Sequence, residues 1–364
     1  MSDYGFRTEV AAAIQAPPAN RPLARDLLSG ALDRPCFVVG RNEDTAALVG
    51  RLRLDGVVHD YAEPGAMWNG LRCVPIGALP SGAVVINGST SISPIAVDQR
   101  LRAAGLTAIV SLHDLVCAGE GAVAAPAFVR EQQADWRDAS AEWSDLFASL
   151  EDDASRQTLL DVLRYRLTAD VRFMGDYRVR IEEQYFEPFL ELKGETFVDA
   201  GGFDGDTTEG FCQRDPDYRQ VHLFEPSPRN LRAARERLQA FRDIAFHPEA
   251  LSDAPGTMRF DAEAGSASAV SSGGGQEVPV TTLDLAVAEP VSFIKMDLEG
   301  WEMKALAGGA RHIGQDRPKL AIAVYHSASD FRDVWRYARS IHPDYKVYLR
   351  HYTQGWSETV MFFV

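Results

Sequence analysis

Short apolar segments alternate with helical patterns twice along this chain, and that alternation constrains the fold more than any other feature. The first series of apolar segments lies at 36–40, 56–61, 83–88 and 107–111, and the second at 196–199, 221–224, 244–246, 292–295 and 320–324. Helical spacing of apolar residues falls between them, at 45–54, 95–104, 229–241 and 301–307. Strands that alternate with helices form parallel sheets with helices on their faces. The sequence therefore predicts an α/β fold with two sheets.

The segment between the two series separates them into predicted domains. Residues 119–126 are rich in small residues, which is typical of a linker, and 128–168 carry apolar residues at helical spacing. Such spacing requires only burial, so a helical connector is a simpler interpretation than a cap over a site. We predict an N-terminal Rossmann-like α/β domain at 1–124, a helical connector or cap at 125–190 and a second α/β domain at 191–364.

The end of the chain departs from the alternation. Two β-rich segments, 345–352 and 358–364, flank a turn that contains Gln354 and Gly355. Strands joined by a short Gly-containing turn form an antiparallel hairpin. We expect this hairpin to close the second sheet.

Composition narrows the class of partner. The 364 residues include 52 acidic and 37 basic residues, a net charge of −15, which repels nucleic acid and anionic membranes. The four cysteines form no CxxC pair, and no apolar run approaches the ~18–20 residues that span a bilayer. The N-terminus lacks the basic start of a signal peptide. We expect a cytoplasmic protein whose partner is a small-molecule or carbohydrate acceptor, and a homodimer is compatible with these observations.

The segment 197–208 is the most informative about chemistry. A predicted strand ends at Asp199, and Gly201, Gly202 and Gly205 follow before residues that can begin a helix. Glycines at such a turn let the backbone approach a ligand, and a helix N-terminus presents N–H groups to it. Glu225 ends the next strand, close to the offset of about 20 residues at which an acidic group meets ribose hydroxyls. This arrangement predicts a nucleotide-containing cofactor.

Charge then separates two cofactors. The loop carries Asp199, Asp204 and Asp206, whose carboxylates would repel a diphosphate but suit an amine and a sulfonium. S-adenosylmethionine (SAM) is therefore favoured over NAD. Helix capping is the alternative role for Asp204 and Asp206.

Several motifs occur together in a fixed order: EQYF at 183–186, VDAGGFDGDTT, FEPSP, ALSD at 250–253, TLD, IKMDLEGWE and RHYT…ETV. In this combination the chain resembles the FkbM-type family of SAM-dependent O-methyltransferases, over about 182–364. The resemblance implies a class I methyltransferase fold with seven strands, the last of them antiparallel. It also implies methyl transfer to a hydroxyl of a sugar or a glycosylated natural product.

The resemblance assigns roles by motif position. Asp199 and Gly201 are expected at the methionine end of the cofactor, Glu225 at the ribose, and Leu251, Ser252 and Asp253 near the adenine. Gln184 and Tyr185 either close over the cofactor or substrate or dock a helix into the core. The candidate cofactor-binding residues are Gln184, Tyr185, Asp199, Gly201, Gly202, Asp204, Glu225, Leu251, Ser252 and Asp297.

The candidate catalytic residues are Asp297, Glu299 and His326, which follow two successive predicted strands. Ligands of open α/β sheets bind at the carboxyl ends of the strands. O-methylation requires loss of the hydroxyl proton, either to a carboxylate or histidine or through a divalent metal that lowers the hydroxyl pKa. Both routes stay open, as do structural roles: Glu299 as a helix cap and His326 as a hydrogen-bonding partner.

Three other features have two interpretations each. The segment 265–277 is either a lid or a solvated linker, and His351 and Tyr352 are either acceptor contacts or edge-strand packing. In the first domain Gly40 stands where a dinucleotide motif has three glycines, so we expect a small-molecule site or a dimer-forming module.

A non-catalytic binding module and an NAD-dependent oxidoreductase are the alternatives to a methyltransferase.

Overall fold

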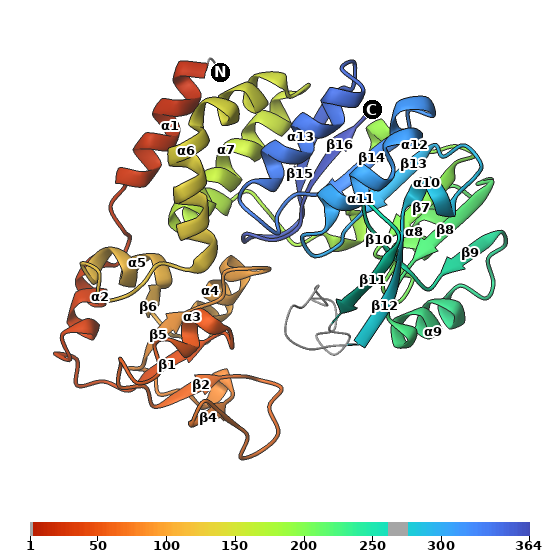
Figure 1. Ribbon diagram of the computed structural model, residues 1–364. Helices are drawn as coiled ribbons and strands as arrows, with labels where there is room; N and C mark the ends of the chain where they lie inside the picture. Colours follow the sequence, from red (N-terminus) through yellow and green to blue (C-terminus); the bar gives the residue numbers. More distant parts are fainter. Residues whose placement is uncertain (1–2, 261–275) are drawn as a thin grey trace. The chain divides into compact units, whose positions relative to one another are not determined.

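The computed structural model describes residues 3–260 and 276–364, and these residues form two compact units. Unit 1 comprises Met1–Ser140, Gln157–Val179 and Tyr352–Ser357, whereas unit 2 comprises Ala141–Arg156, Arg180–His351 and Glu358–Val364. Each unit has its own sheet (Figure 1). Residues 265–275 of the segment predicted as a lid or linker lie outside the described residues.

Unit 1 contains a six-stranded sheet in the order β3-β4-β2-β1-β5-β6, in which only the β3–β4 pair is antiparallel. Buried apolar side chains of β1 and β5 form its centre, as the continuous apolar runs predict. The strands are β1 (Cys36–Val39), β2 (Gly56–Val58), β3 (Met67–Trp68), β4 (Leu71–Val74), β5 (Val84–Asn87) and β6 (Ala108–Ser111). The helices before the linker are α1 (Asp3–Gln15), α2 (Arg21–Leu28), α3 (Glu43–Ala46), α4 (Pro94–Ala103) and α5 (Leu112–Ala118).

Two features of unit 1 differ from the sequence prediction. The helix predicted at 45–54 ends at Ala46 as α3, and Gly50, with φ of +89°, adopts a conformation that a helix excludes. The antiparallel β3–β4 hairpin was not predicted, because a pair of short strands leaves little periodicity in the sequence.

The connector is helical, as predicted, and consists mainly of α6 (Ala127–Ser149) and α7 (Asp153–Thr168). Helix α6 is kinked at Ala139, where φ is −134°, next to the point at which the chain passes from unit 1 to unit 2. In unit 2, Trp143 of α6 packs against Phe331 with ring centroids 5.4 Å apart. Short 3₁₀ turns follow at Val171–Met174, Ile181–Glu183 and Pro188–Leu190.

Unit 2 contains a seven-stranded sheet in the order β15-β16-β14-β13-β7-β8-β9, and the last strand, β16, is antiparallel to its neighbours. This is the class I methyltransferase topology that the resemblance implies, including the terminal hairpin. The strands are β7 (Thr196–Ala200), β8 (Gln220–Phe224), β9 (Ile244–His247), β13 (Phe293–Met296), β14 (Lys319–Ala323), β15 (Val347–His351) and β16 (Thr359–Phe363).

The helices of unit 2 form two groups. Helices α8 (Asp206–Arg214) and α9 (Pro228–Arg237) contact each other, and α10 (Leu283–Ala286), α11 (Glu302–Gly308), α12 (Ala310–Gln315) and α13 (Asp330–Ile341) form the second group. Because parallel crossovers are right-handed and the chain builds the sheet outward from β7 in both directions, the two groups cover opposite faces. Phe197 of β7 lies in the core, stacked on Phe211 and Phe293 at 4.3 and 4.9 Å between centroids.

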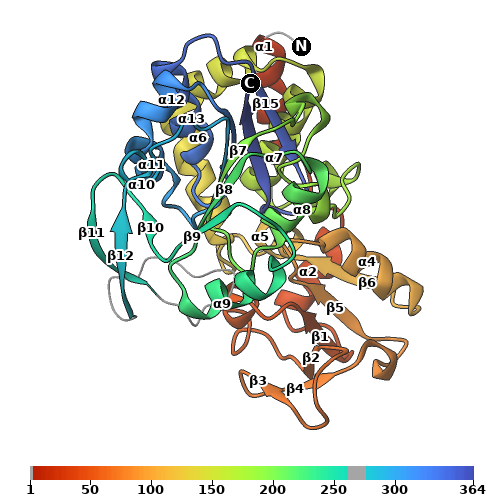
Figure 2. The same ribbon diagram turned by 90° about the vertical axis from the view of Figure 1, so that its right-hand side faces the viewer.

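A second, three-stranded sheet in unit 2 was not predicted. Its order is β10-β12-β11, with β10 (Ala250–Leu251) parallel and β11 (Gly256–Phe260) antiparallel to β12 (Gln276–Thr281), as Figure 2 shows. The adenine candidate Leu251 therefore ends a short strand. In the described parts of the chain, no helix is long and apolar enough to cross a membrane.

Candidate functional site

The glycines after β7 are required by packing against neighbouring backbone and side chains. A Cβ atom on Gly201, whose φ is +79°, would lie 2.0 Å from the carbonyl oxygen of Asp297, and one on Gly202 would lie 2.4 Å from Leu223. The N–H groups of Gly201 and Gly202 both donate to the carbonyl of Phe224, at 3.0 Å. The loop after β7 is thereby held against the carboxyl end of β13.

Asp199 forms a buried ion pair with Lys295. The two residues are register partners on β7 and β13, and Lys295 Nζ lies 3.0 Å from Asp199 Oδ1. Thr208 donates to Asp199 Oδ2 at 2.7 Å, and Lys295 also donates to the carbonyl of Gly201 at 2.7 Å. Burial raises the pKa of Asp199, and Lys295 opposes that rise.

The Asp199 side chain has no exposed surface, and its carboxylate is directed at Lys295 and Thr208. Asp204 pairs with Arg237 at 2.6 Å, and Asp206 accepts a hydrogen bond from the N–H of Thr207 at the start of α8. Two of the three loop carboxylates are thus neutralised by a basic partner. The loop carboxylates therefore favour SAM over NAD only weakly. Asp206 is the first residue of α8, whose N-cap is Gly205 with no side-chain cap hydrogen bond, so Asp206 does not cap the helix.

Glu225 lies at the carboxyl end of β8 and holds the same loop. Its two carboxylate oxygens accept hydrogen bonds from the N–H groups of Ser227, at 2.7 Å, and Phe203, at 3.0 Å. Oε1 also accepts from Asn230 Nδ2 at 3.5 Å, whereas Oε2 can accept a second hydrogen bond, so a ribose hydroxyl would still find an acceptor. Burial raises the pKa of Glu225 to about 7, although these hydrogen bonds lower it in part.

Two of the three candidates for the adenine end, Leu251 and Ser252, are buried. Ser252 donates its N–H to Thr281 across the small sheet, and its hydroxyl accepts a hydrogen bond from the Trp301 indole at 3.2 Å. Leu251 is 1% exposed. Asp253, which follows them, is exposed and accepts from the Ser252 hydroxyl at 3.0 Å.

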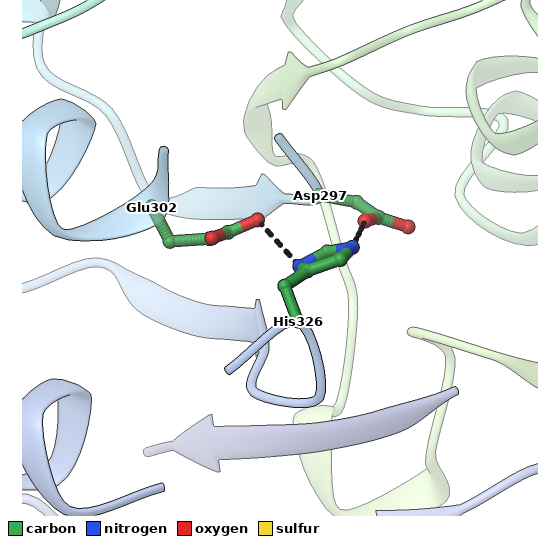
Figure 3. Close-up of side chains that lie close together, drawn as sticks. All are labelled: Asp297, Glu302 and His326. Carbon is green, nitrogen blue, oxygen red and sulfur yellow. Dashed lines mark ion pairs between the residues drawn. The ribbon is translucent and has the colours of Figure 1, made fainter. Parts of the chain in front are cut away.

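At the carboxyl ends of β13 and β14 the structure brings the three catalytic candidates together. His326 Nε2 lies 3.5 Å from Asp297 Oδ1 and 3.4 Å from Glu299 Oε2, and its Nδ1 lies 3.1 Å from Glu302 Oε1. Figure 3 shows the imidazole between Asp297 and Glu302, with one nitrogen directed at each. Glu302 is anchored in turn, because its Oε1 accepts from the N–H groups of Leu298, at 2.7 Å, and Gly300, at 3.4 Å.

The segment before the methyltransferase core joins this cluster through Tyr185. The Tyr185 hydroxyl donates to Asp297 Oδ2 at 2.6 Å and accepts from Gln184 Nε2 at 2.9 Å. Gln184 Nε2 also donates to Glu358 Oε2 at 2.9 Å, and the Tyr325 hydroxyl is 3.4 Å from Asp297 Oδ1. Tyr185 and Gln184 are both 4% exposed. They pack beside the candidate acceptor end.

The electrostatics of the cluster follow from burial among like charges. Burial raises the pKa of Glu299 to about 7; His326 opposes this shift, and Asp297 and Glu302 add to it. Burial would lower the pKa of His326, but Glu302, Asp297 and Glu299 together outweigh it and raise that pKa to about 9. The region therefore carries an excess of negative charge around one imidazole.

Sequence reasoning missed Lys295, Glu302, Tyr325 and Glu358. Lys295, Glu302 and Glu358 lie within the motifs IKMDLEGWE and RHYT…ETV, so a signal was present. The structure does not add His351 and Tyr352 to the site. His351 is 1% exposed and bonds Thr359 Oγ1 at 2.9 Å, and Tyr352 is fully buried, so both have the packing role.

Comparisons with known proteins agree with this geometry. Residues 199–351 match the family model described as methyltransferase FkbM domain. The crystal structure of methyltransferase FkbM from Methylobacillus flagellatus KT is 24% identical, with a TM-score of 0.75 and coverage of 100% of both chains. This likeness shows that the fold is shared over the whole chain.

More distant solved structures share only part of the chain. Fibrillarin from Aeropyrum pernix, in complex with S-adenosyl-L-methionine, is 12% identical over 50% of this chain and 71% of its own, with a TM-score of 0.34. An rRNA methylase from Streptococcus thermophilus is 16% identical over 47% of this chain and 87% of its own, with a TM-score of 0.32. No curated protein matches the chain.

Proposed function

We propose that this protein is a SAM-dependent O-methyltransferase, because residues 199–351 match the FkbM methyltransferase domain model. The acceptor we propose is a hydroxyl of a sugar or a glycosylated natural product, a class suggested by the family resemblance. One observation carries the proposal: the loop after β7 touches the acidic cluster, since the Gly201 backbone packs directly on Asp297. A donor at the loop and an acceptor at the cluster would then be neighbours.

The residues around the loop fit a cofactor that ends in a ribose and an adenine. Glu225 is 5% exposed, and its Oε2 atom can accept one more hydrogen bond, for example from a ribose hydroxyl. The turn between β7 and α8 lies beside it, and its backbone groups can contact the cofactor. When bound, SAM supplies a methyl carbon on a positively charged sulfur. Asp199 and Lys295 contribute indirectly: Lys295, paired with Asp199, donates a hydrogen bond to the Gly201 carbonyl and so fixes the loop.

The acidic cluster supplies the remaining chemistry, which is removal of the hydroxyl proton. The hydroxyl oxygen must attack the methyl carbon in line, and its proton must pass to a nearby base. Asp297 Oδ2 is occupied by Tyr185, whereas the Glu299 side chain is 28% exposed and accessible to an incoming hydroxyl. Glu299 is therefore the carboxylate that would meet the acceptor.

Calorimetric titration of the full chain with SAM, S-adenosylhomocysteine and NADH tests the cofactor. We expect SAM and S-adenosylhomocysteine to bind. The Glu225→Gln variant should weaken SAM binding about tenfold or more, since a hydrogen bond to a charged group contributes about 1.5–3 kcal/mol. Glu236→Gln, an exposed acidic residue of α9, is the matched control and should bind as the wild type does. Binding of NADH without SAM would contradict the proposal.

Transfer of a labelled methyl group from SAM to a panel of sugars and glycosides tests the reaction. Label that appears as a methyl ether, and is reduced in Glu299→Gln, supports O-methylation. Binding of SAM with no transfer to any hydroxyl would favour the non-catalytic module instead.

A further inference from the structure

We propose that Asp297, Glu299 and His326 bind a divalent cation of the Mn²⁺ or Mg²⁺ class, and that Glu302 orients the imidazole for it. The three side chains project from the carboxyl ends of β13 and β14, and their polar atoms converge on His326 Nε2. The role of the ion in catalysis rests on the proposed function, but its binding does not.

The imidazole is the observation that points to a ligand. The His326 side chain is only 9% exposed, and its Nε2 atom is fully buried. Among residues 3–260 and 276–364, none forms a hydrogen bond with Nε2 or with Nδ1, although Nδ1 lies 3.1 Å from Glu302 Oε1. A buried ring nitrogen without a hydrogen bond is costly, and it is directed at two carboxylates. An ion between them would give this nitrogen a partner.

The two ring nitrogens have different roles. One imidazole can offer a single nitrogen to an ion, and metal-bound histidines usually donate their other N–H to a carboxylate or carbonyl. Glu302 is 2% exposed and already accepts two backbone N–H groups, so it faces Nδ1 as a fixed acceptor (Figure 3). Glu302 is therefore a positioning residue, and Nε2 is the nitrogen left for the ion.

The carboxylates of Asp297 and Glu299 are also oriented toward His326. Tyr185 holds Asp297 through Oδ2, and Oδ1, which also accepts a hydrogen bond from the Tyr325 hydroxyl at 3.4 Å, is directed at His326. Glu299 and Gly300 have φ of +52° and +90°, a turn that brings the Glu299 side chain back to His326. His326 Nε2 lies 3.5 Å from Asp297 Oδ1 and 3.4 Å from Glu299 Oε2, slightly wider than the about 3 Å between neighbouring ligand atoms of an octahedral ion. Among the described residues, the side chains whose ligand atoms all lie within 4.8 Å of one another are Asp297, Glu302 and His326, so the Glu299 carboxylate would have to move toward Asp297 to share an ion with it.

The donor set selects the class of ion. Two carboxylate oxygens and one imidazole nitrogen suit Mn²⁺ or Mg²⁺ better than a thiolate-seeking metal, and the partly exposed Asp297 and Glu299 leave further positions for water or acceptor oxygens. A bound hydroxyl would lose its proton more readily, because the ion lowers its pKa.

Titration of chelator-treated full-length protein with Mn²⁺, followed by electron paramagnetic resonance and calorimetry, tests the site. We expect one Mn²⁺ per chain that Mg²⁺ displaces. Asp297→Asn and Glu299→Gln should each weaken Mn²⁺ binding at least tenfold, and Glu302→Gln should weaken it about tenfold to 100-fold. Glu236→Gln should leave it unchanged. Circular dichroism and SAM titration of each variant show whether it is folded.

The outcomes separate this inference from the proposed function. If no Mn²⁺ binds to folded wild-type protein, or if Glu299→Gln binds it as the wild type does, the cation site is wrong. Methyl transfer that continues undiminished in excess EDTA would refute the catalytic role of the ion and leave the methyltransferase intact. Mn²⁺ bound to the wild type and lost in the variants, in a protein that transfers no methyl group, would support the site and refute the function.

Discussion

Removal of the Lys295 ammonium, with Asp199 left in place, is the sharpest test of how the cofactor loop is held. The Lys295→Met variant keeps most of the side-chain volume and deletes one charge of a pair in which both partners are almost fully buried. At 3.0 Å the gross attraction is about 5–6 kcal/mol at an effective dielectric constant of about 20. An unpaired buried carboxylate costs about 3–5 kcal/mol, and we expect the variant to lose that much stability.

A double variant separates the pair from general damage. Asp199→Asn removes the negative charge and keeps a side chain that can still accept from Thr208. If the two side chains are coupled, the double variant Lys295→Met/Asp199→Asn should lose less unfolding free energy than the two single variants together. We expect the difference to be about 2 kcal/mol or more. Arg237→Met is the matched control: Arg237 pairs with Asp204 of the same loop but is 36% exposed, so its loss should cost about 1 kcal/mol or less.

Urea unfolding followed by circular dichroism measures these differences. Since the chain has two units, hydrogen exchange of β7 and β13 peptides should accompany it and report on unit 2 alone. A loss below about 1 kcal/mol in Lys295→Met, or strict additivity with Asp199→Asn, would refute the reasoning.

Two further predictions concern the same end of the sheet. Gly201→Ala places a Cβ atom 2.0 Å from the Asp297 carbonyl oxygen, so it should cost at least about 3 kcal/mol of unfolding free energy, whereas Gly256→Ala, with open space around it, should change stability by about 0.5 kcal/mol or less. The raised pKa of Glu225 means that the folded state holds this proton more tightly than the unfolded state, whose value is the ordinary 4.5. The stabilisation of the folded state by protonated Glu225 is therefore complete below pH 4.5. It is lost as the pH rises through about 7, and the loss is at most about 3 kcal/mol of unfolding free energy. Wild type should lose stability relative to Glu225→Gln between pH 4.5 and pH 8 in urea titrations, and parallel pH profiles would contradict this.

The parallel strands of unit 2 were predictable because each is a continuous apolar run that ends in a polar or small residue. Buried on both faces, such strands leave a strong signal, and the alternation with helices then fixes their direction. Two of the strands that escaped prediction, β3 and β10, have only two residues each, too few for any periodicity. The other unpredicted strands, β4, β11 and β12, have four, five and six residues.

The candidate site was predictable where residues stood at strand ends, and hidden where they met across strands. Asp297, Glu299 and His326 follow β13 and β14, so their positions are visible in the sequence. The partnership of Asp199 with Lys295 depends on β7 pairing with β13, two strands separated by two further strands of the same sheet along the chain. The order of the strands depends on the whole sheet, so a local sequence pattern does not predict that β7 pairs with β13.

The adjacency of β7 and β13 also explains why the two halves of the site must be considered together. Lys295 Nζ contacts both the Asp199 carboxylate and the Gly201 carbonyl, and Gly201 packs on the carbonyl of Asp297. A shift of this lysine would therefore move both the loop after β7 and the backbone of Asp297, which lie on the proposed donor and acceptor sides of the site. Loss of Lys295 should impair binding of both substrates at once. Loss of Glu225, which accepts hydrogen bonds from Phe203 of the loop and from Ser227 and Asn230, should impair the donor and spare the acceptor.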